Sequence, residues 1–196
     1  MRRVGPLPAE QPLFLSLTVD VKAREWLLRF HDLENYLFPL FRTECFRPAQ
    51  FMLVSGTKRV GGGSTLQLGV AQPMDGDGLF GWTHYACSPG SGTQTKSWKE
   101  RIRRSLISAA LTPMRDGPVA VQLAWRGAAR RNWTWLWKPT GDAMGPVLGE
   151  TRPYNPLDDR IVELHLHWGP DDSLGHSVQV GMWWRIASDQ LESGKT

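Results

Sequence analysis

Asn155-Pro-Leu-Asp-Asp-Arg-Ile-Val-Glu-Leu-His-Leu-His-Trp168 combines a turn, two acids and a strand in fourteen consecutive residues. Asn155 and Pro156 signal the turn, and the adjacent carboxylates Asp158 and Asp159 follow it. Apolar and polar residues then alternate, which predicts a strand with one buried and one polar face. The buried face would hold Val162, Leu164, Leu166 and Trp168, and the polar face Glu163, His165 and His167. Because carboxylates are costly to bury unpaired, the acidic pair is either a solvated turn or half of a divalent-metal site.

The composition indicates a folded protein without a membrane span. The chain has 196 residues, 41% of them hydrophobic, and ten tryptophans, which argues against disorder. No apolar run approaches the roughly 18 residues that a membrane helix needs, and the start Met1-Arg2-Arg3 lacks the apolar region of a signal peptide. Cys45 and Cys87 stand singly. We therefore expect a cytoplasmic protein with free thiols, and one disulfide is the alternative.

Positive charge is concentrated in the middle of the chain. The net charge is only +4, but residues 91–140 hold ten Lys and Arg against Glu100 and Asp116. That segment carries 10 − 2 = +8, so the remainder carries 4 − 8 = −4. A concentrated basic region suits a protein that meets a polyanion, and the alternative is an ordinary solvated helix face. The residues that we expect to contact DNA are Lys96, Lys99, Arg101, Arg103, Arg104, Arg130 and Arg131.

Hydrophobic periodicity predicts a similar series of elements in each half of the chain. In the first half, residues 13–19 and 26–30 alternate as two strands, Asp32 is a candidate helix N-cap, and residues 51–54 and 66–70 form two more strands. Apolar residues at helical spacing predict a helix over residues 97–111. The elements expected after it are strands at 119–125 and 133–137, a motif segment at 138–149, the strand that follows Asp159, and a strand at 178–186.

The recurring order favours an α+β fold with an internal duplication. At an offset of 107 residues, Arg24, Trp26 and Pro39 fall on Arg131, Trp133 and Pro146, and Asn35 falls on Asp142. We predict two β-β-α-β-β halves that form a pseudo-dimer with a connecting basic helix. The first half would span residues 1–72, a connector rich in Pro and Gly would span 73–96, and the second half would span 97–196.

Two groups of acidic residues could together hold magnesium. Asp32 and Glu34 lie two positions apart with Asn35 beside them, and Asp158 and Asp159 open a strand. Carboxylate and amide oxygens are ligands that Mg²⁺ accepts while it keeps several waters. One or two such ions orient a water for in-line attack on a phosphodiester. This hypothesis makes Asp32, Glu34, Asp158 and Asp159 catalytic and metal-binding residues.

These motifs resemble the RusA-like Holliday-junction endonucleases. That family carries an Asp-Leu-Asp-Asn motif at a helix start and an Asp-Asp pair that leads into a strand. Asp32-Leu33-Glu34-Asn35 is similar to the first element, and Asp158-Asp159 with the strand after it is similar to the second. Ser97-Trp98-Lys99 also resembles a Trp-Lys helix that precedes the family's core. The resemblance implies a small α+β fold, homodimers that act on branched DNA with Mg²⁺, and Asp142 as a further metal ligand in the slot of the helix acids.

The sequence departs from this family in ways that leave two interpretations open. The family's two acidic elements lie about 20 residues apart in one subunit, whereas here they lie in different halves. The family's helix lysine falls on Phe38 in the first half and on Gly145 in the second. The chain is therefore either a fused pseudo-dimer with one composite site, or a non-cleaving relative that binds nucleic acid or a partner protein.

Histidines and tryptophans offer weaker alternatives. His165 and His167 share one strand face and could bind a metal in a small-molecule enzyme, but a polar sheet face explains them more simply. Trp133, Trp135 and Trp137 could stack on unpaired bases, but one face of a core is the simpler interpretation.

Overall fold

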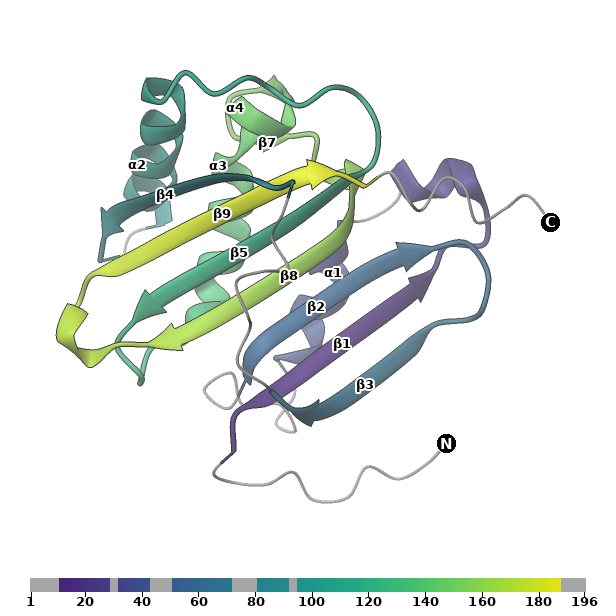
Figure 1. The fold of residues 1–196 in the computed structure, drawn as a ribbon, viewed down its shortest axis with the longest axis horizontal. Helices are drawn as coiled ribbons and strands as arrows, with labels where there is room; N and C mark the ends of the chain where they lie inside the picture. Colours follow the sequence, from purple (N-terminus) through teal and green to yellow (C-terminus); the bar gives the residue numbers. More distant parts are fainter. Residues whose placement is uncertain (1–10, 29–31, 43–50, 72–80, 92–94, 188–196) are drawn as a thin grey trace.

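The computed structural model describes residues 11–28, 32–42, 51–71, 81–91 and 95–187. They form an α+β fold in which one mixed seven-stranded sheet carries helices on one face (Figure 1). The spatial order of the strands is β3-β1-β2-β8-β5-β9-β4. The strands are β1 (Leu13–Asp20), β2 (Phe51–Arg59), β3 (Thr65–Val70), β4 (Thr83–Gly90), β5 (Val119–Gly127), β8 (Ile161–Pro170) and β9 (Val178–Ile186), with a separate pair of β6 (Glu150–Arg152) and β7 (Asn155–Pro156).

The helices lie behind the sheet in Figure 1 and cover its apolar face. They are α1 (Leu33–Leu40), α2 (Thr95–Ser108), α3 (Trp137–Ala143) and α4 (Gly145–Leu148), with short 3-10 turns η1 (Arg24–Leu28), η4 (Trp133–Leu136), η5 (Asp158–Arg160) and η6 (Asp172–Leu174). Trp98, Ile102 and Leu106 recur every four residues on α2 and are fully buried, as the sequence pattern predicts. On β8 the predicted apolar face is buried at every position from Val162 to Trp168.

Strands β2 and β8 join two three-stranded units into one sheet. In the first unit β1 lies between a parallel β2 and an antiparallel β3, and in the second β5 lies between a parallel β8 and an antiparallel β9. Both units have the same register irregularity after the first pair of their parallel strands. The pairs are Leu13–Phe51 then Phe14–Leu53 in one unit, and Val119–Ile161 then Ala120–Glu163 in the other.

The antiparallel β2–β8 pairing is symmetrical. Leu53 pairs with His167 and Thr57 with Glu163, so the centre of the pairing is Ser55 opposite His165. Ser55 and His165 occupy equivalent positions, four residues after the start of β2 and of β8. The β2–β8 pairing is therefore centred on two residues that hold the same position in their strands.

The predicted strands at 26–30 and 133–137 are wrong. Residues 24–28 and 133–136 form η1 and η4, and Trp137 begins α3, while Phe30 lies outside the described residues. Trp133 and Trp137 are buried and their rings lie 5.1 Å apart, whereas Trp135 between them is 68% exposed. Two buried residues four positions apart share a helical face, so a period-two pattern of tryptophans fits a helix equally well here. Each unit is therefore β-α-β-β with short 3-10 turns.

The predicted connector contains a strand of the sheet. Residues 83–90 form β4, which pairs with β9 and makes one edge of the sheet. Pro89 and Gly90 stand at the end of β4, where the register shifts. The Pro and Gly residues that suggested a loop thus terminate a strand, which is where edge strands tolerate them.

Pro39 lies inside α1, and the helix continues for one residue beyond it.

None of the helices among the described residues is long and apolar enough to cross a membrane. Cys87 is a free thiol, and burial raises its pKa to about 11. Cys45 lies outside the described residues.

Gly56 sets how closely α1 approaches β2. A Cβ at this position would lie 3.2 Å from Leu33 Cδ2 and 3.3 Å from Leu37 Cδ1, both of which are buried side chains of α1. We expect Gly56→Val to lower the free energy of unfolding by about 1–3 kcal/mol through overpacking, as measured by urea denaturation. Thr57→Val introduces the same side chain at the next position and should change stability by less than about 0.5 kcal/mol. Equal effects of the two substitutions would contradict this packing.

Candidate metal centre

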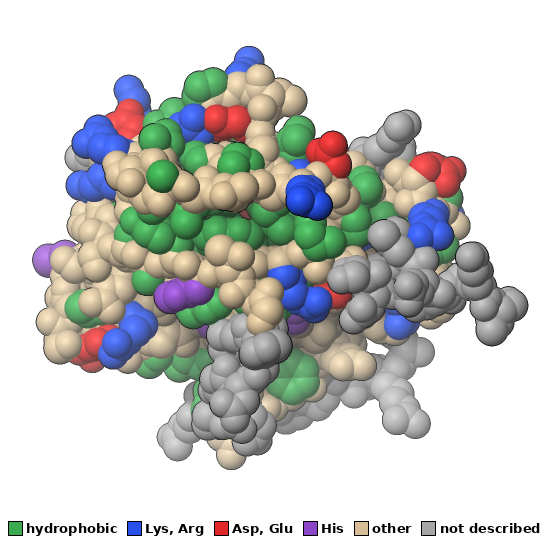
Figure 2. All heavy atoms as spheres, turned by 45° about the horizontal axis from the view of Figure 1, so that its top comes forward, with side chains coloured by type: hydrophobic (Ala, Val, Ile, Leu, Met, Phe, Trp, Pro, Cys, Tyr) green, Lys and Arg blue, Asp and Glu red, His purple; other side chains and the backbone are tan. Residues whose placement is uncertain are grey.

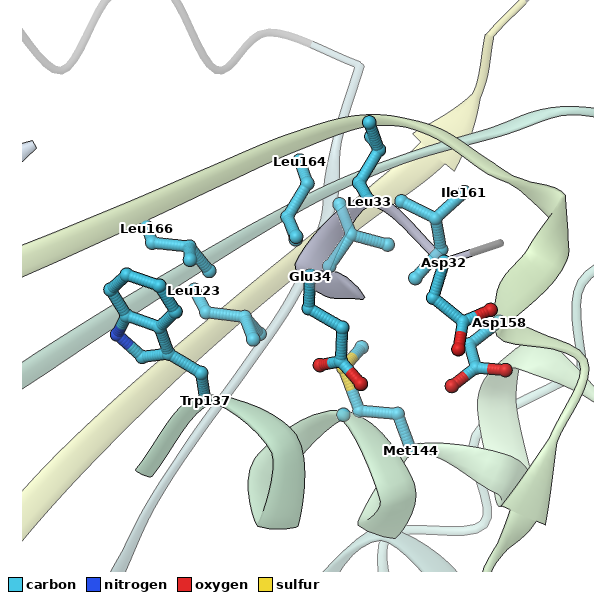
Figure 3. Close-up of a pocket in the computed structure, with 12 residues that line it drawn as sticks. Asp32, Leu33, Glu34, Leu123, Trp137, Met144, Asp158, Ile161, Leu164 and Leu166 are labelled. Carbon is cyan, nitrogen blue, oxygen red and sulfur yellow. The ribbon is translucent and has the colours of Figure 1, made fainter. Parts of the chain in front are cut away.

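Three carboxylates from the two units meet behind the sheet. Asp32, Glu34 and Asp158 each offer an oxygen, and these three oxygens lie within 4.8 Å of one another. All three side chains are half-buried. Figure 3 shows them at one end of a pocket that Leu123, Leu164 and other apolar side chains line at the other end. The structure therefore brings together three of the four residues that the sequence nominated as catalytic.

The strand pairing explains why residues so distant in sequence meet. Strands β1 and β2 are parallel and end on the same side, where Asp20 lies opposite Arg59. Because β8 is antiparallel to β2, it begins on that same side, with Glu163 opposite Thr57. The chain after β1 turns through η1 and begins α1 there with Asp32 at the N-cap position. The start of α1 and the start of β8 are thus adjacent.

Two buried cations fix the turn that carries Asp158. Arg160 is 7% exposed and donates to three backbone carbonyls, those of Arg115, Gly117 and Leu148. Lys58 is fully buried at the end of β2, and its Nζ donates to the carbonyl oxygen of Asp159 at 2.9 Å. Buried cations are stable only when their donors are satisfied. These bonds therefore tie η5 to the core and hold Asp158 at the mouth of the pocket.

Lys138 of α3 connects the carboxylates. Its Nζ lies 2.7 Å from Glu34 Oε1, 3.0 Å from Asp142 Oδ1 and 3.9 Å from Asp158 Oδ2. The Lys138 side chain is 57% exposed, so it reaches the cluster from solvent. A second lysine, Lys99 of α2, lies 2.6 Å from Asp142 Oδ2. The two lysines thus cover both oxygens of Asp142, but they leave Asp32 without a lysine partner among the ion pairs of the described residues.

Burial and the neighbouring charges shift the pKa values of four groups in and around this cluster. Burial, and next the charge of Asp32, raise the pKa of Asp158 to about 7, although Lys138 opposes the shift. Burial also raises the pKa of Glu34 against the effect of Lys138. For Lys138 burial disfavours the charge, but Glu34 and Asp142 outweigh it and raise the pKa. Burial lowers the pKa of Lys58 by more than the nearby acids raise it.

The donor set fits a hard divalent cation. The pocket has a volume of about 20 Å³, which accommodates one water or one small ion. Two ligands of one Mg²⁺ lie at most about 4.2 Å apart, because each Mg–O distance is about 2.1 Å. Three octahedral ligands include at least two adjacent pairs about 3.0 Å apart, so oxygens within 4.8 Å of one another need to close by up to about 2 Å, or to bind through a retained water. Gly141 leaves room for this, since even a Cβ there would lie 3.8 Å from Glu34 Oε2.

The other two predicted ligands take different places. Asp142 lies beside the cluster, but Lys99 and Lys138 occupy its oxygens, so it is a counter-ion in this structure. Asp159 follows Asp158, but its carboxylate is outside the group of three, and its backbone oxygen accepts a hydrogen bond from Lys58. Asn35 donates to Asp32 Oδ2 at 3.2 Å and therefore orients the first carboxylate.

The predicted DNA-contacting residues divide into three groups. Lys99 and Arg103 face Asp142 and Glu150, and Arg103 donates two 2.6 Å bonds to Glu150. The exposed basic residues of α2 are Lys96, Arg101 and Arg104. Arg130 and Arg131 follow β5 at the end where β8 also finishes, with Gly127 opposite Pro170. Since β8 has ten residues, they lie about 30 Å from the start of that strand.

The histidine alternative gains no ligand set. His165 and His167 lie on the sheet face opposite the helices. Burial lowers the pKa of His165 below its ordinary value, and burial lowers the pKa of His167 to about 4. Both are therefore neutral at pH 7. The three acids above form the only group of at least three potential ligands among the residues that the structure places.

Sequence reasoning missed the lysines of the site. Lys138 lies in the predicted motif segment and Lys58 lies between the predicted strands at 51–54 and 66–70, and neither stands at the family's lysine position. A signal for Lys138 was its i,i+4 spacing to Asp142. Lys58 carried no signal, because a lysine at the end of a strand is normally solvated.

No family model, no curated protein and no solved structure matches the chain.

The raised pKa of Asp158 predicts an unusual pH dependence of stability. The pKa of Asp158 in the folded state, about 7, exceeds the ordinary 3.8. Protonation of Asp158 therefore adds to the free energy of unfolding, fully below pH 4, and this contribution is lost as the pH rises through 7. We expect Asp158→Asn to be more stable than wild type at pH 8. The advantage at pH 8 should exceed that at pH 5 by about 1–3 kcal/mol, as measured by urea denaturation.

Asp20 supplies a control of opposite sign. Backbone N–H groups of Lys22, Gly61 and Gly63 lower its pKa from 3.8, so its contribution is present at neutral pH and fades as the pH falls through its folded-state pKa. Asp20→Asn should therefore cost stability at pH 7 and cost less in acid. A pH-independent difference between Asp158→Asn and wild type would show that Asp158 is not held in a charge-crowded site.

Proposed function

We propose that the chain is a Mg²⁺-dependent, structure-selective DNA endonuclease that resembles the RusA-like Holliday-junction endonucleases. The observation that carries this proposal is the meeting of Asp32, Glu34 and Asp158 within 4.8 Å. These residues come from the two sequence motifs that resemble that family. Their convergence supports the composite-site interpretation over two unrelated acidic loops.

The two-unit architecture supports a pseudo-dimer. The β-α-β-β order, the strand pairing and the register irregularity occur twice, and β2 meets β8 symmetrically about Ser55 and His165. In a homodimer such a pairing would create two equivalent sites. Here the acids of α1 belong to the first unit and the acid of η5 to the second, so the proposed fusion contributes one complete set of three.

Each residue of the site has a distinct task in this proposal. Asp32, Glu34 and Asp158 would hold Mg²⁺. The ion, when bound, supplies charge stabilisation and an activated water for phosphodiester hydrolysis. Asn35 orients Asp32, and Lys58 and Arg160 hold the turn that carries Asp158. Lys138 balances the carboxylates, and its exposed stem lets its ammonium move from Asp158 toward a bound phosphate.

Basic residues beside the site suit a polyanionic substrate. Lys99 and Lys138 meet at Asp142, and α2 also carries the exposed cations Lys96, Arg101 and Arg104. Backbone phosphates are bound through such charges without regard to base sequence. A preference for DNA shape rather than sequence follows from that kind of contact.

A second candidate function is a non-catalytic module of the same fold that binds nucleic acid or a partner protein. The observation that favours it is the short ion pair between Lys138 and Glu34 at 2.7 Å. If Lys138 remains in this contact, its charge offsets that of the carboxylates and weakens their attraction for a metal ion. Dependence of DNA cleavage on Mg²⁺ separates the two functions.

The proposal predicts Mg²⁺-dependent cuts in an end-labelled four-way DNA junction and fewer in a matched linear duplex. Asp158→Asn and Glu34→Gln should each reduce the rate by about 100-fold or more, because loss of a metal-site partner costs at least 10- to 100-fold. The rate at limiting Mg²⁺ should rise with pH up to about 7, where Asp158 ionises. Gel electrophoresis of the labelled strands measures both effects.

Asp171→Asn is the matched control, since Asp171 pairs with Arg126 at the far end of β5 and should leave cleavage unchanged. Junction binding without cuts, in any concentration of Mg²⁺, would favour the non-catalytic module. Absence of both binding and cutting would refute the nucleic-acid function.

A further inference from the structure

We propose that one face of α2, together with β4, is a track for two successive DNA backbone phosphates, with Arg101 and Arg104 as its contacts. This inference rests on the proposed function and names the contact surface of its substrate. Figure 2 shows Lys and Arg side chains gathered over the α2 side of the molecule.

Packing divides the basic residues of α2 between two faces. Trp98, Ile102 and Leu106 are fully buried and fix the rotation of the helix. Lys99 and Arg103, one turn apart, then reach the carboxylates of Asp142 and Glu150. Their charges are neutralised within the protein, so they are poor candidates for phosphate contacts.

Three exposed cations of α2 are left for a ligand, and two of them, Arg101 and Arg104, line the same pocket, whereas Lys96 does not line it. Both arginines are exposed, and neither forms an ion pair with a carboxylate of the described residues. Among the described residues, Arg101 donates to Ser97 Oγ at 3.3 Å. An arginine without a carboxylate partner keeps its planar fork of donors for a phosphate.

These arginines border an open pocket of about 440 Å³ between α2 and β4. The helical wall includes Arg101, Arg104, Ser105 and Ser108, and it forms one face because Arg104 and Ser105 lie three and four positions after Arg101 and Ser108 lies one further turn along. Tyr85 of β4 forms the opposite wall, and its hydroxyl hydrogen-bonds Ser105. Ser108 adds a small hydroxyl side chain to the helical wall beside the arginines, and hydroxyls are common phosphate donors.

Gly90 helps to place the first arginine. It has a φ of 95° at the end of β4, and a Cβ there would lie 3.5 Å from the Arg101 guanidinium carbon. Such a distance is an ordinary contact, so Arg101 lies against the end of β4, and the positive φ is what favours glycine at residue 90. From residue 101 to 108 the helix rises about 10 Å, which suits a short run of phosphates in one strand.

The test measures the salt dependence of DNA binding by fluorescence anisotropy, with a labelled four-way junction between 50 and 300 mM KCl, a range of about sixfold. Each phosphate contact contributes about 0.9 to the slope of log K against log salt. We expect Arg101→Gln/Arg104→Gln to reduce that slope by about 1.8 and to weaken binding at low salt. Thermal melting checks that these exposed substitutions leave the fold intact.

Lys22→Gln/Arg126→Gln removes the same charge elsewhere, at the turn after β1 and at the end of β5. An unchanged slope in Arg101→Gln/Arg104→Gln would overturn the track. So would an equal loss in both double variants, which would indicate a general effect of net charge. Retained DNA affinity with lost binding to an acidic partner protein would overturn it in favour of a protein interface.

The same preparations distinguish failure of the track from failure of the function. If wild type cuts the junction with Mg²⁺ while Arg101→Gln/Arg104→Gln binds like wild type, only the track is wrong. If wild type neither binds nor cuts, the proposed function is wrong and the track falls with it. The track also predicts that Arg101→Gln/Arg104→Gln retains cleavage at saturating protein, because these residues lie outside the group of three carboxylates.

Discussion

The antiparallel pairing of β2 with β8 is the constraint on which the rest of the structure depends. It brings the start of β8 beside the ends of β1 and β2, where α1 also begins. A parallel pairing would place Asp158 at the opposite end of the sheet from Asp32 and Glu34. The proximity of these acids is therefore a property of the topology, and the local sequences around them only supply the carboxyl groups.

The cluster is held together against its own charge. Burial and mutual repulsion raise the pKa of Asp158 and Glu34, and such a cost persists only where surrounding structure determines the positions. Hydrogen bonds from Arg160 and Lys58 to backbone carbonyls hold the acidic turn against the interior of the protein. Lys138 balances the negative charge from the solvent side. Lys58 and Arg160 are buried, whereas Lys138 is exposed. A metal ion that binds the carboxylates would therefore displace only the Lys138 ammonium. This arrangement accounts for both proposed functions.

Much of the sheet and two of the acidic elements could be predicted from the sequence, because strands buried on one face alternate strictly. Val162 to Trp168 shows this clearly. The turn η4 could not be predicted, since tryptophans at alternating positions fit both a strand and a helix, and only packing shows that Trp135 is exposed. Lys138 and Lys58 became part of the site through contacts between units more than 100 residues apart. Such contacts depend on the fold and have no local pattern.

The most direct test of the composite site is a crystal structure of the protein soaked in Mn²⁺, a substitute for Mg²⁺ that scatters anomalously. The account predicts one anomalous peak between Asp32, Glu34 and Asp158, with the Lys138 ammonium displaced from Asp158. An unperturbed contact between Lys138 and Glu34, together with no peak at these three carboxylates, would contradict it.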